Sequence, residues 1–268
     1  MSVPHGPLRR LTVQASVLRA PNAGPMTLEG TNSYRLTRPG SAGAIIVDPG
    51  PGDPAHLTAL ADTGSVALIL ITHRHHDHTD GAAELARLTG APVRAFDPDH
   101  SIGAAPLHDG EVIEAGGVVV SVVATSGHTT DSVCFLLAGD GPTGSVLTGD
   151  TVLGRGTTVI AHPDGRLGPY LDSLRRLVGL GPATVLPGHG PMLLDLAAVG
   201  VQYLEHREQR LSAIRAALAV IGSEASVEAI TDAVYLDIDP AVRGAAERSV
   251  ATQLDYLRAE RARGPWPP

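Results

Sequence analysis

Four histidines and two aspartates share one short stretch of the chain, ITHRHHDHTDG, at residues 71–81. The apolar run SVALIL precedes it and is typical of a buried strand. In an extended chain, side chains two residues apart point to the same side, so His73 and His75 can converge on one point. Asp77 and His78 lie just beyond, where the chain turns toward a helix, and can face a second point. Burial without a metal would leave several of these groups unpaired, so the stretch predicts a metal site.

Three more metal-binding side chains follow apolar runs elsewhere. His128 lies in TSGHTTDS, Asp150 ends SVLTGD, and His189 lies in VLPGHG. Flanking glycines let the backbone pack close to a site. The seven side chains divide into two sets around two metal ions: His73, His75 and His128 in one, Asp77, His78 and His189 in the other, and Asp150 as the bridge. Imidazole and carboxylate groups favour two Zn2+ ions, with Mn2+ or Fe2+ as alternatives.

Other candidate residues have structural interpretations. His76 is expected to face outward or to support a ligand, and Cys134 in SVCFLL is expected to pack in the core. Asp48 in VDPGPG is either a turn former or an acceptor that orients a ligand histidine. The isolated histidines are expected to be structural or solvated; they are His5, His56, His100, His108 and His206.

The elements that position these residues can be predicted from their patterns. Short β-like runs, punctuated by Gly, Pro and Asp, fill the first 150 residues. Helical patterns fall at about 54–62, 80–89 and 169–180, and Thr79 or Asp80 could cap the second. Strands and helices mixed in this way indicate layered sheets with outer helices.

A second region begins near residue 200. Three helical patterns follow there, and Ser226 is expected to cap the second of them. We predict a catalytic domain at 1–200, a small helical domain at 201–264 and a tail at 265–268. Residues 205–263 hold 8 arginines and 10 acidic residues, a balance of -2 that does not suit a winged helix built for duplex DNA.

The motifs resemble those of a known family. HRHHDH matches the H-x-H-x-D-H motif of the metallo-β-lactamase fold superfamily, and GHTTDS, TGD and PGHG match its remaining motifs in order. The resemblance covers roughly residues 10–200. It implies an α+β fold, a four-layer αββα sandwich with metals at one edge of the paired sheets.

One group of the superfamily resembles the chain most. This group contains the mitochondrial lactamase-beta-like endoribonuclease and has a winged-helix-like C-terminal domain. The stretches that carry the similarity are LEGTNSY (28–34), TGDTVLGRGTTVI (148–160), YLDSLRRL (170–177) and LPGHGP (186–191). The resemblance continues more weakly into the C-terminal helices.

Two divalent cations that share a water lower its pKa from ~15.7 to around neutrality, so hydrolysis by a bridging hydroxide is expected. The catalytic residues are then Asp77, which orients the hydroxide, together with His78 and Asp150. Arg155 suits an anionic substrate, and His162 could protonate a leaving group. The full set of predicted substrate-binding residues is Thr129, Ser132, Arg155, Thr157, Thr158 and His162.

Several substrates fit this chemistry. The first hypothesis is a small-molecule ester, thioester or lactam, with glyoxalase-II-like thioester cleavage as one form. The second is single-stranded RNA, as the family resemblance implies, and the third is a non-catalytic metal-binding protein. A dedicated lactamase is less expected, because Asp150 stands where the best-known lactamases use cysteine.

Composition narrows the choice. The net charge is -8, all 20 basic residues are arginine, and aromatic residues make up 3% of the chain. Phosphate contacts need clustered positive charge, so no duplex-DNA binding is expected. No apolar stretch of about 18 residues predicts a membrane span. A single cysteine and the absence of a secretory signal indicate a cytoplasmic protein.

Overall fold

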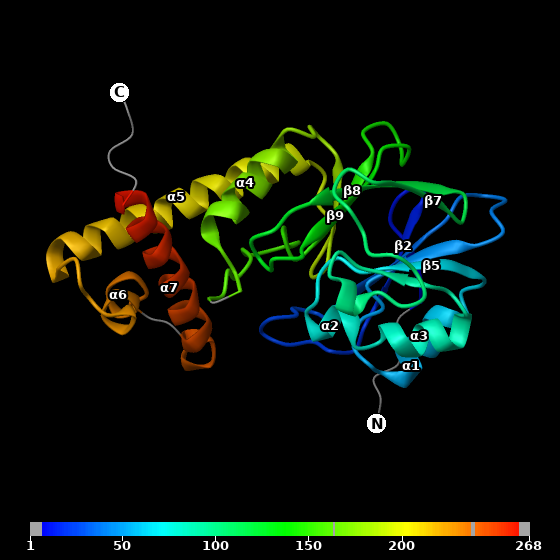
Figure 1. The fold of residues 1–268 in the computed structure, drawn as a ribbon, viewed down its shortest axis with the longest axis horizontal. Coiled ribbons are helices and arrows are strands. Elements are labelled where there is room, and N and C mark those ends of the chain that lie inside the picture. Colours follow the sequence, from blue (N-terminus) through cyan, green and yellow to red (C-terminus); the bar gives the residue numbers. More distant parts are fainter. Residues whose placement is uncertain (1–6, 163, 237–238, 263–268) are drawn as a thin grey trace.

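Two β-sheets stacked face to face form the centre of the molecule (Figure 1). The computed structural model describes residues 7–162, 164–236 and 239–262. The first sheet consists, in spatial order, of β1 (Arg9–Arg10), β2 (Ala15–Arg19), β3 (Asn32–Leu36), β4 (Ala44–Val47), β5 (Val66–Leu70) and β6 (Val93–Arg94). The second consists of β11 (Thr184–Pro187), β10 (Ser145–Gly149), β9 (Val133–Leu137), β8 (Val118–Ala124) and β7 (Val112–Ala115).

The pairing of the strands sets which loops meet. In the first sheet, β4, β5 and β6 are parallel, and the other pairs are antiparallel. In the second sheet, β8 and β10 are both antiparallel to β9, and β10 is parallel to β11. The strands β8, β10 and β11 therefore run in one direction and end at one edge of their sheet. The loops that carry His128, Asp150 and His189 leave from that edge.

Helices cover the outer faces of both sheets. A parallel strand pair needs a crossover connection, and helices supply it between β4 and β5 and between β10 and β11. The helices are α1 (Pro54–Ala61), α2 (His76–Thr79), α3 (Ala82–Thr89), α4 (Leu167–Val178), α5 (Leu196–Ile221), α6 (Val227–Val234) and α7 (Pro240–Ala262), with a 3-10 turn at Pro98–His100. Figure 1 shows α1 and α3 on one side of the paired sheets and α4 and α5 on the other. This is the predicted four-layer αββα arrangement.

Three apolar clusters hold the layers together. The middle cluster lies between the sheets and includes the fully buried Leu36, Ile45, Val120 and Phe135. A second cluster packs α1 and α3 on the first sheet, and a third packs α4, α5 and α7 against the second sheet. Cys134 belongs to the third cluster, as predicted, and its burial raises the pKa of the thiol to about 11.

The predicted helices at 54–62, 80–89 and 169–180 correspond to α1, α3 and α4. The predicted cap of α3 was wrong, because Gly81 occupies its N-cap position and forms no side-chain cap bond. Thr79 belongs to α2 instead, and its hydroxyl donates to the carbonyl of His75 at 3.0 Å. A side chain at Gly81 would lie 2.6 Å from Leu57, so α1 and α3 pack closely there.

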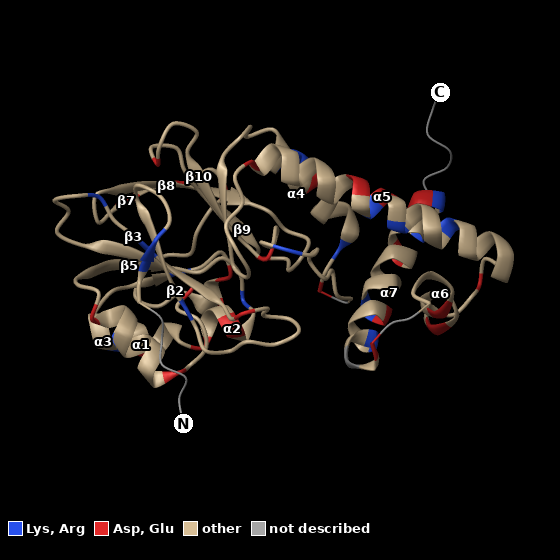
Figure 2. Cartoon of the chain, turned by 180° about the vertical axis from the view of Figure 1, so that it is seen from behind, with Lys and Arg blue, Asp and Glu red and all other residues tan. Residues whose placement is uncertain are grey.

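The C-terminal part is helical. Helix α5 begins at Leu196 and passes through position 201 without interruption, and Gly200 packs tightly against Val178 of α4. Ser226 caps α6, as predicted, by accepting from the backbone N–H of Ala229. Basic and acidic residues are interspersed along α5 and α7 (Figure 2).

All elements described after Asp195 are helices, and the likeness to a winged helix stays a prediction, as does the division at residue 200. The predicted tail at 265–268 and His5 lie outside the described residues. Among the helices described, none has the length and apolar character that a membrane span requires.

Candidate metal centre

The segment after β5 brings two imidazoles together. The chain leaves β5 at Leu70 and carries His73 and His75 to the start of α2. Nε2 of His73 lies 3.1 Å from Nδ1 of His75, and Nε2 of His128 lies 3.0 Å from that same atom. Three imidazole nitrogens, two from the first sheet's side and one from the second sheet's side, thus face one point.

Helix α2 directs a second group of side chains to a neighbouring point. Nε2 of His189 lies 3.1 Å from Oδ2 of Asp77 and 3.3 Å from Nε2 of His78. The two imidazoles are fully buried. His189 follows β11, so this group also takes members from both sheets.

Asp150 lies between the two groups. Its Oδ1 lies 3.5 Å from Nε2 of His78 and 3.4 Å from Nε2 of His189. Its Oδ2 lies 3.8 Å from Nε2 of His128. When Asp150 is counted with the first group, the potential ligand atoms within each group all lie within 4.8 Å of one another. The structure thus brings together the seven side chains that the sequence singles out, in the two predicted sets.

A buried acceptor fixes the orientation of two of the imidazoles. Oδ2 of Asp48 lies 2.8 Å from Nδ1 of His78, and it also accepts the hydroxyl of Thr72 at 2.7 Å. Since Thr72 donates its own hydrogen to Asp48, it accepts from Nδ1 of His73, which lies 3.0 Å away. In their neutral form both imidazoles therefore carry the proton on Nδ1 and present Nε2 to the cluster, the tautomer that binds metal. Of the two interpretations of Asp48, the acceptor is the one that this geometry supports.

Backbone carbonyls orient two further imidazoles. Nδ1 of His128 lies 2.9 Å from the carbonyl oxygen of Val159, and Nδ1 of His189 lies 3.4 Å from that of Gly30. Each ring then directs Nε2 inward. His76 is exposed, in agreement with its predicted outward position.

The pKa values of the clustered histidines and aspartates are shifted by their burial and by one another. Burial, with repulsion between imidazoles, lowers the pKa of His75 to about 4. Burial alone would lower the pKa of His189, but Asp150 and Asp77 raise it to about 10. Burial alone would raise the pKa of Asp77, but the hydrogen bond from His189 lowers it to about 2. The two largely buried carboxylates of Asp77 and Asp150 thus favour positive charge at this point, which a bound cation would supply.

The buried Oδ1 of Asp150 has no hydrogen-bond partner among the described residues. A buried carboxylate oxygen without a hydrogen bond is costly, even with His78 and His189 at 3.5 and 3.4 Å, and coordination of a cation would relieve that cost. The donor set, five imidazoles and two carboxylates, is chemically suited to zinc and to iron or manganese. The residues present therefore fit a pair of divalent cations.

Three of the six predicted substrate-binding residues are buried and form hydrogen bonds within the protein. Thr129 and Ser132 are buried, and their hydroxyls lie 2.7 Å apart, so they brace the loop after His128. Thr158 is also buried and donates its hydroxyl to the carbonyl of Asp150 at 2.7 Å. These three hydroxyls are engaged within the protein.

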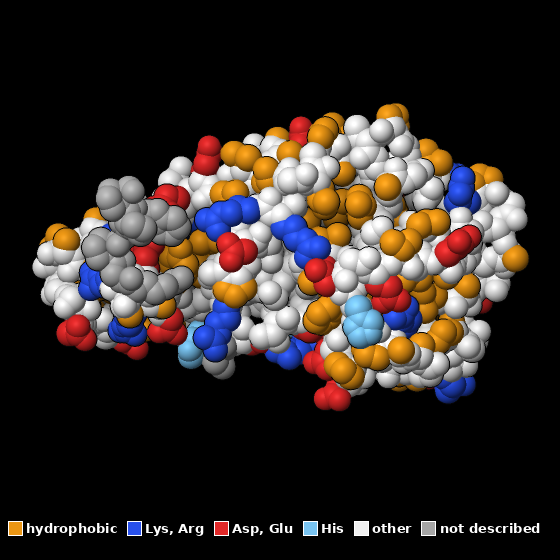
Figure 3. All heavy atoms as spheres, turned by 45° about the horizontal axis from the view of Figure 1, so that its top comes forward, with side chains coloured by type: hydrophobic (Ala, Val, Ile, Leu, Met, Phe, Trp, Pro, Cys, Tyr) orange, Lys and Arg blue, Asp and Glu red, His pale blue; other side chains and the backbone are white. Residues whose placement is uncertain are grey.

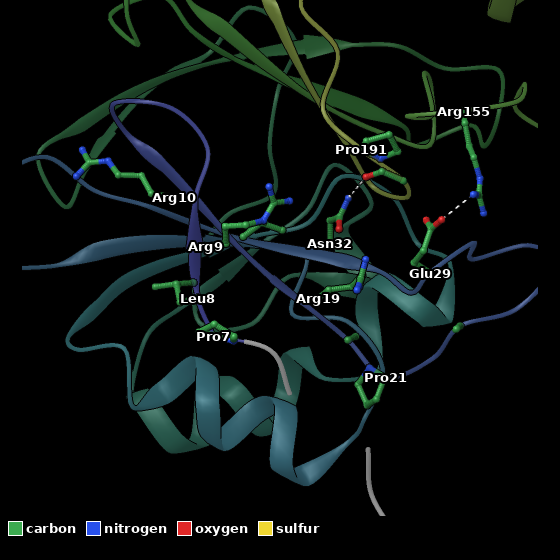
Figure 4. Close-up of a pocket in the computed structure, with 14 residues that line it drawn as sticks. Pro7, Leu8, Arg9, Arg10, Arg19, Pro21, Glu29, Asn32, Arg155 and Pro191 are labelled. Atoms are coloured by element: carbon green, nitrogen blue, oxygen red, sulfur yellow. Dashed lines mark hydrogen bonds and ion pairs between the residues drawn. The ribbon is translucent and has the colours of Figure 1, made fainter. Parts of the chain in front are cut away.

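The other three predicted residues lie on the surface of the loop. Arg155 pairs with Glu29 at 2.7 Å and lines a cavity of about 930 Å³ together with Arg9 and Arg19 (Figure 4). Nε2 of His162 lies 3.3 Å from a carboxylate oxygen of Asp255 on α7. The hydroxyl of Thr157 lies 3.4 Å from Nε2 of His206 on α5.

A model of the metallo-beta-lactamase superfamily matches residues 26–189, the segment that contains all seven side chains of the cluster. The chain belongs to the metallo-β-lactamase superfamily. Lactamase-like protein nscB from Neosartorya fischeri is 36% identical to it over 217 residues, 77% of this chain and 63% of the relative. A beta-lactamase-like protein 2 homolog from Caenorhabditis elegans is 32% identical over 264 residues, 94% of this chain and 86% of the relative. The match to nscB, like that to lactamase-like protein adaB from Aspergillus niger at 61%, spans less than two thirds of the relative's length.

Solved structures of the superfamily share the fold. A metallo-beta-lactamase family protein from Thermus thermophilus superposes with a TM-score of 0.76 at 23% identity and covers 93% of this chain and 94% of its own. A beta-lactamase domain protein from Burkholderia ambifaria gives 0.81 at 22% identity, with 95% and 88% covered. A protein determined in a di-iron-bound form gives 0.55 at 25% identity, with 72% and 98% covered.

Sequence reasoning missed some residues of this superfamily member's site. Thr72 connects Asp48 to His73. Val159 orients His128 through its backbone carbonyl, which a pattern of side chains cannot predict. Arg207 was also missed, although it is buried beside the 157–159 segment and donates to the carbonyl of Thr158. A charged residue on the apolar face of the helical pattern that begins near residue 200 was the available signal. His56, expected to be structural or solvated, is buried and lies 2.9 Å from the hydroxyl of Ser33.

Proposed function

We propose that this chain is a metal-dependent hydrolase whose centre holds two divalent cations. The observation that carries the proposal is Asp150, because its two oxygens face the two groups of donors. A closed structural zinc site uses four ligands around one ion, whereas seven donors around two points leave coordination positions for water and substrate. Zinc suits the donors best. The di-iron-bound form of one related structure supports iron as an alternative.

Each donor has a role in this proposal. His73, His75 and His128 would hold one cation, Asp77, His78 and His189 would hold the other, and Asp150 would contribute to both. Two such cations would lower the pKa of a shared water from about 15.7 toward 7 and so supply hydroxide at neutral pH. Asp77, on the first turn of α2, would orient the attacking oxygen while helping to hold one cation. Asp48 and Thr72 keep His78 and His73 in the tautomer that the centre requires.

The substrate class proposed is a small molecule with an ester, thioester or lactam carbonyl, with glyoxalase-II-like thioester cleavage as one form. The charge of the protein supports this choice over a nucleic acid. The chain has a net charge of -8 and no lysine. On the face drawn in Figure 3, arginines and acidic residues are interspersed rather than gathered by sign. A polyanion would meet no continuous basic track there.

The test is turnover of a generic thioester, ester and lactam by protein loaded with zinc. We expect activity that disappears with a chelator, returns with zinc, and is lost in Asp150→Ala. Asp172→Ala on the exposed face of α4 is the matched control and should keep full activity, because Asp172 pairs with Arg175 on the same helix, outside the seven-residue cluster. A fully metal-loaded protein that hydrolyses none of the substrates, RNA included, would instead be a non-catalytic metal-binding protein.

A second candidate is a single-strand-specific endoribonuclease. The similarity of LEGTNSY, TGDTVLGRGTTVI and LPGHGP to the mitochondrial lactamase-beta-like endoribonuclease group favours it, as do the helices that follow the sandwich. Thioester and single-stranded RNA should be compared on one preparation. RNA cleavage that is lost in Asp150→Ala, without thioester turnover, would establish this candidate over the first. RNA cleavage that persists in the variant would come from a contaminating nuclease.

A further inference from the structure

A second cavity, of about 300 Å³, lies between the segment 157–159 and helices α5 and α7. We call it the α5 cavity. Polar groups in its wall come from Thr157, Thr158, His206, Arg207, Arg210 and Ser249. Small and apolar side chains of α7, with Tyr235 after α6, close its other side. Segments about 90 residues apart in the sequence thus build one hollow.

The α5 cavity is basic within an acidic protein. His206, Arg207 and Arg210 share about one turn of α5, and the described residues of the wall include no carboxylate. Neither arginine has an ion-pair partner within residues 7–162, 164–236 and 239–262. By contrast, Arg215 on the same helix pairs with Glu208 and Glu260. The positive charge of the cavity is therefore left without an opposite charge in this part of the chain.

Arg207 is buried to an unusual degree for a guanidinium, with 4% of its surface exposed. One of its terminal nitrogens donates to the carbonyl of Thr158, and its Cζ lies 5.2 Å from the centre of the Tyr170 ring. Its Nε is buried and finds no hydrogen-bond partner in the described part of the chain. Desolvating a cation in this way is costly unless a carboxylate, phosphate or similar group compensates it.

The remaining groups suit an oxyanion. The Cζ of Arg210 stacks 4.6 Å from the centre of the Tyr235 ring, which holds this second guanidinium at the cavity wall. A planar guanidinium donates paired hydrogen bonds to phosphate or carboxylate. The hydroxyls of Thr157 and Ser249 add further donors to the wall.

The wall of the α5 cavity also supports the metal centre. Arg207 donates to the carbonyl of Thr158, whose hydroxyl donates in turn to the carbonyl of Asp150 at 2.7 Å. The next carbonyl, that of Val159, accepts from Nδ1 of His128 at 2.9 Å. Thr158 and Val159 thus line a basic hollow and also hydrogen-bond to Asp150 and His128 of the cluster.

We propose that the α5 cavity is a binding site for an oxyanion, a phosphate or carboxylate group, separate from the seven-residue cluster. The bound anion satisfies Arg207 and Arg210 and holds the 157–159 segment in the position that supports His128 and Asp150. The anion belongs either to a free ligand or to the non-reacting end of the substrate, and the recognition chemistry is the same in both cases.

The direct test is calorimetric titration with inorganic phosphate and with succinate. Chelated wild-type protein and Asp150→Ala protein are used, so that binding at the metal centre does not contribute. We expect saturable binding in both. Arg210→Gln and Arg207→Lys should weaken it roughly tenfold or more, because charge-assisted hydrogen bonds are lost. Arg215→Gln, on the same helix outside the cavity, should leave it unchanged.

Two results would overturn the proposal. One is that neither probe saturates the chelated protein at millimolar concentration. The other is that Arg210→Gln, which removes a partly exposed side chain and tests the site even if Arg207→Lys fails to fold, binds both probes as tightly as wild type. The titration measures binding to metal-free protein and therefore does not depend on hydrolysis. The anion-site proposal can be refuted while the hydrolase proposal holds, and the hydrolase proposal can be refuted while the anion site holds.

Kinetics then distinguish the two sources of the anion. If the α5 cavity takes the substrate's own end, phosphate competes with a carboxylate-bearing thioester, and Arg210→Gln raises KM for that thioester but not for a neutral one. If it takes a free ligand, phosphate changes kcat for the neutral thioester in wild type and not in Arg210→Gln. Either pattern supports the site. Equal kinetics in wild type and Arg210→Gln, with and without phosphate, would contradict its link to the metal centre.

Discussion

Oδ2 of Asp48 lies 2.8 Å from Nδ1 of His78, and it accepts the hydroxyl of Thr72 at 2.7 Å. The Asp48 backbone has a φ of 52°, in the left-handed region that aspartate adopts more readily than most residues. The residue thus turns the chain after β4 and also orients His78 directly and His73 through Thr72. One buried carboxylate fixes two imidazoles, one in each donor group.

Asp48→Asn should lower zinc affinity by roughly 10- to 100-fold, the usual cost of removing an acceptor behind a ligand histidine. The amide keeps the volume of the side chain but loses the anionic acceptor that both Thr72 and His78 use. Competition with a zinc chelator measures the affinity. Asp62→Asn, exposed at the end of α1, is the control and should match wild type. Equal zinc affinity in Asp48→Asn and wild type would contradict the role given to Asp48.

Gly188→Ala should disturb the metal centre while the fold is retained. A Cβ at Gly188 would lie 2.6 Å from Oδ1 of Asp150 and 2.8 Å from Cε1 of His78, closer than carbon atoms normally approach. We expect zinc affinity to fall roughly tenfold or more, as for other losses of ligand orientation. Gly139→Ala, whose Cβ would make only ordinary contact at 3.6 Å, is the matched control. Unchanged zinc binding and activity in Gly188→Ala would show that the centre does not need this close approach.

Glu111→Gln should destabilise the protein by about 1 kcal/mol at pH 7, the upper range for a partly exposed pair. The carboxylate of Glu111 accepts hydrogen bonds from both terminal nitrogens of Arg94, at 2.7 and 3.0 Å. The pair connects β6 of the first sheet to the residue just before β7 of the second. The ion pair with Arg94 lowers the pKa of Glu111 from its usual 4.5. The stabilisation is therefore present above pH 4.5 and is lost as the pH falls through the lower folded pKa.

Urea denaturation at pH 7 and at stepwise lower pH checks this difference. The gap between wild type and Glu111→Gln should narrow steadily below pH 4.5, the usual pKa of the group. Glu84→Gln removes a similar two-point contact, with Arg87, on an exposed helix face and should have no measurable effect. A gap between wild type and Glu111→Gln that widens on acidification would contradict the assigned sign.

Removal of metal should lower the melting temperature. A ligand that binds only the folded state stabilises that state by about 4 kcal/mol when the free ligand concentration is roughly 1,000 times Kd. For a chain of this size, that corresponds to roughly 10 °C. Calorimetric scans with zinc and with a chelator measure the shift, and Asp150→Ala should show a much smaller one. An identical melting temperature in both conditions would contradict specific binding to the folded protein.

Much of the centre could be predicted from the sequence because its donors lie in segments that follow apolar runs typical of strands. His128, Asp150 and His189 come after apolar runs that turn out to be β8, β10 and β11, and parallel orientation brings their ends to one edge. Helix positions followed from apolar spacing, as for α4, where the fully buried Leu174 and Leu177 lie on one face. Local sequence patterns are enough for elements whose position follows from the spacing of apolar residues along the chain.

Long-range pairing could not be predicted in the same way. Arg155 looked suited to an anionic substrate, but Glu29, far earlier in the chain, meets it at 2.7 Å. Thr129 and Ser132 stand in a motif beside His128, a proposed ligand, yet their hydroxyls contact each other inside the loop. The cap of α3 went to Gly81 because packing against Leu57 leaves no room for a side chain. In each case a partner elsewhere in the fold, or a steric limit set by another element, decides the outcome.

Each donor group takes members from both sheets, and this has a consequence for the order of assembly during synthesis. The first group is incomplete until Asp150 has left the ribosome, and the second until His189 has. A nascent chain that has folded only its first sheet holds His73, His75, Asp77 and His78 but lacks the opposing half of either group. On the proposed function, each donor group is complete only once the two sheets have come together, so tight cation binding would require the closed sandwich.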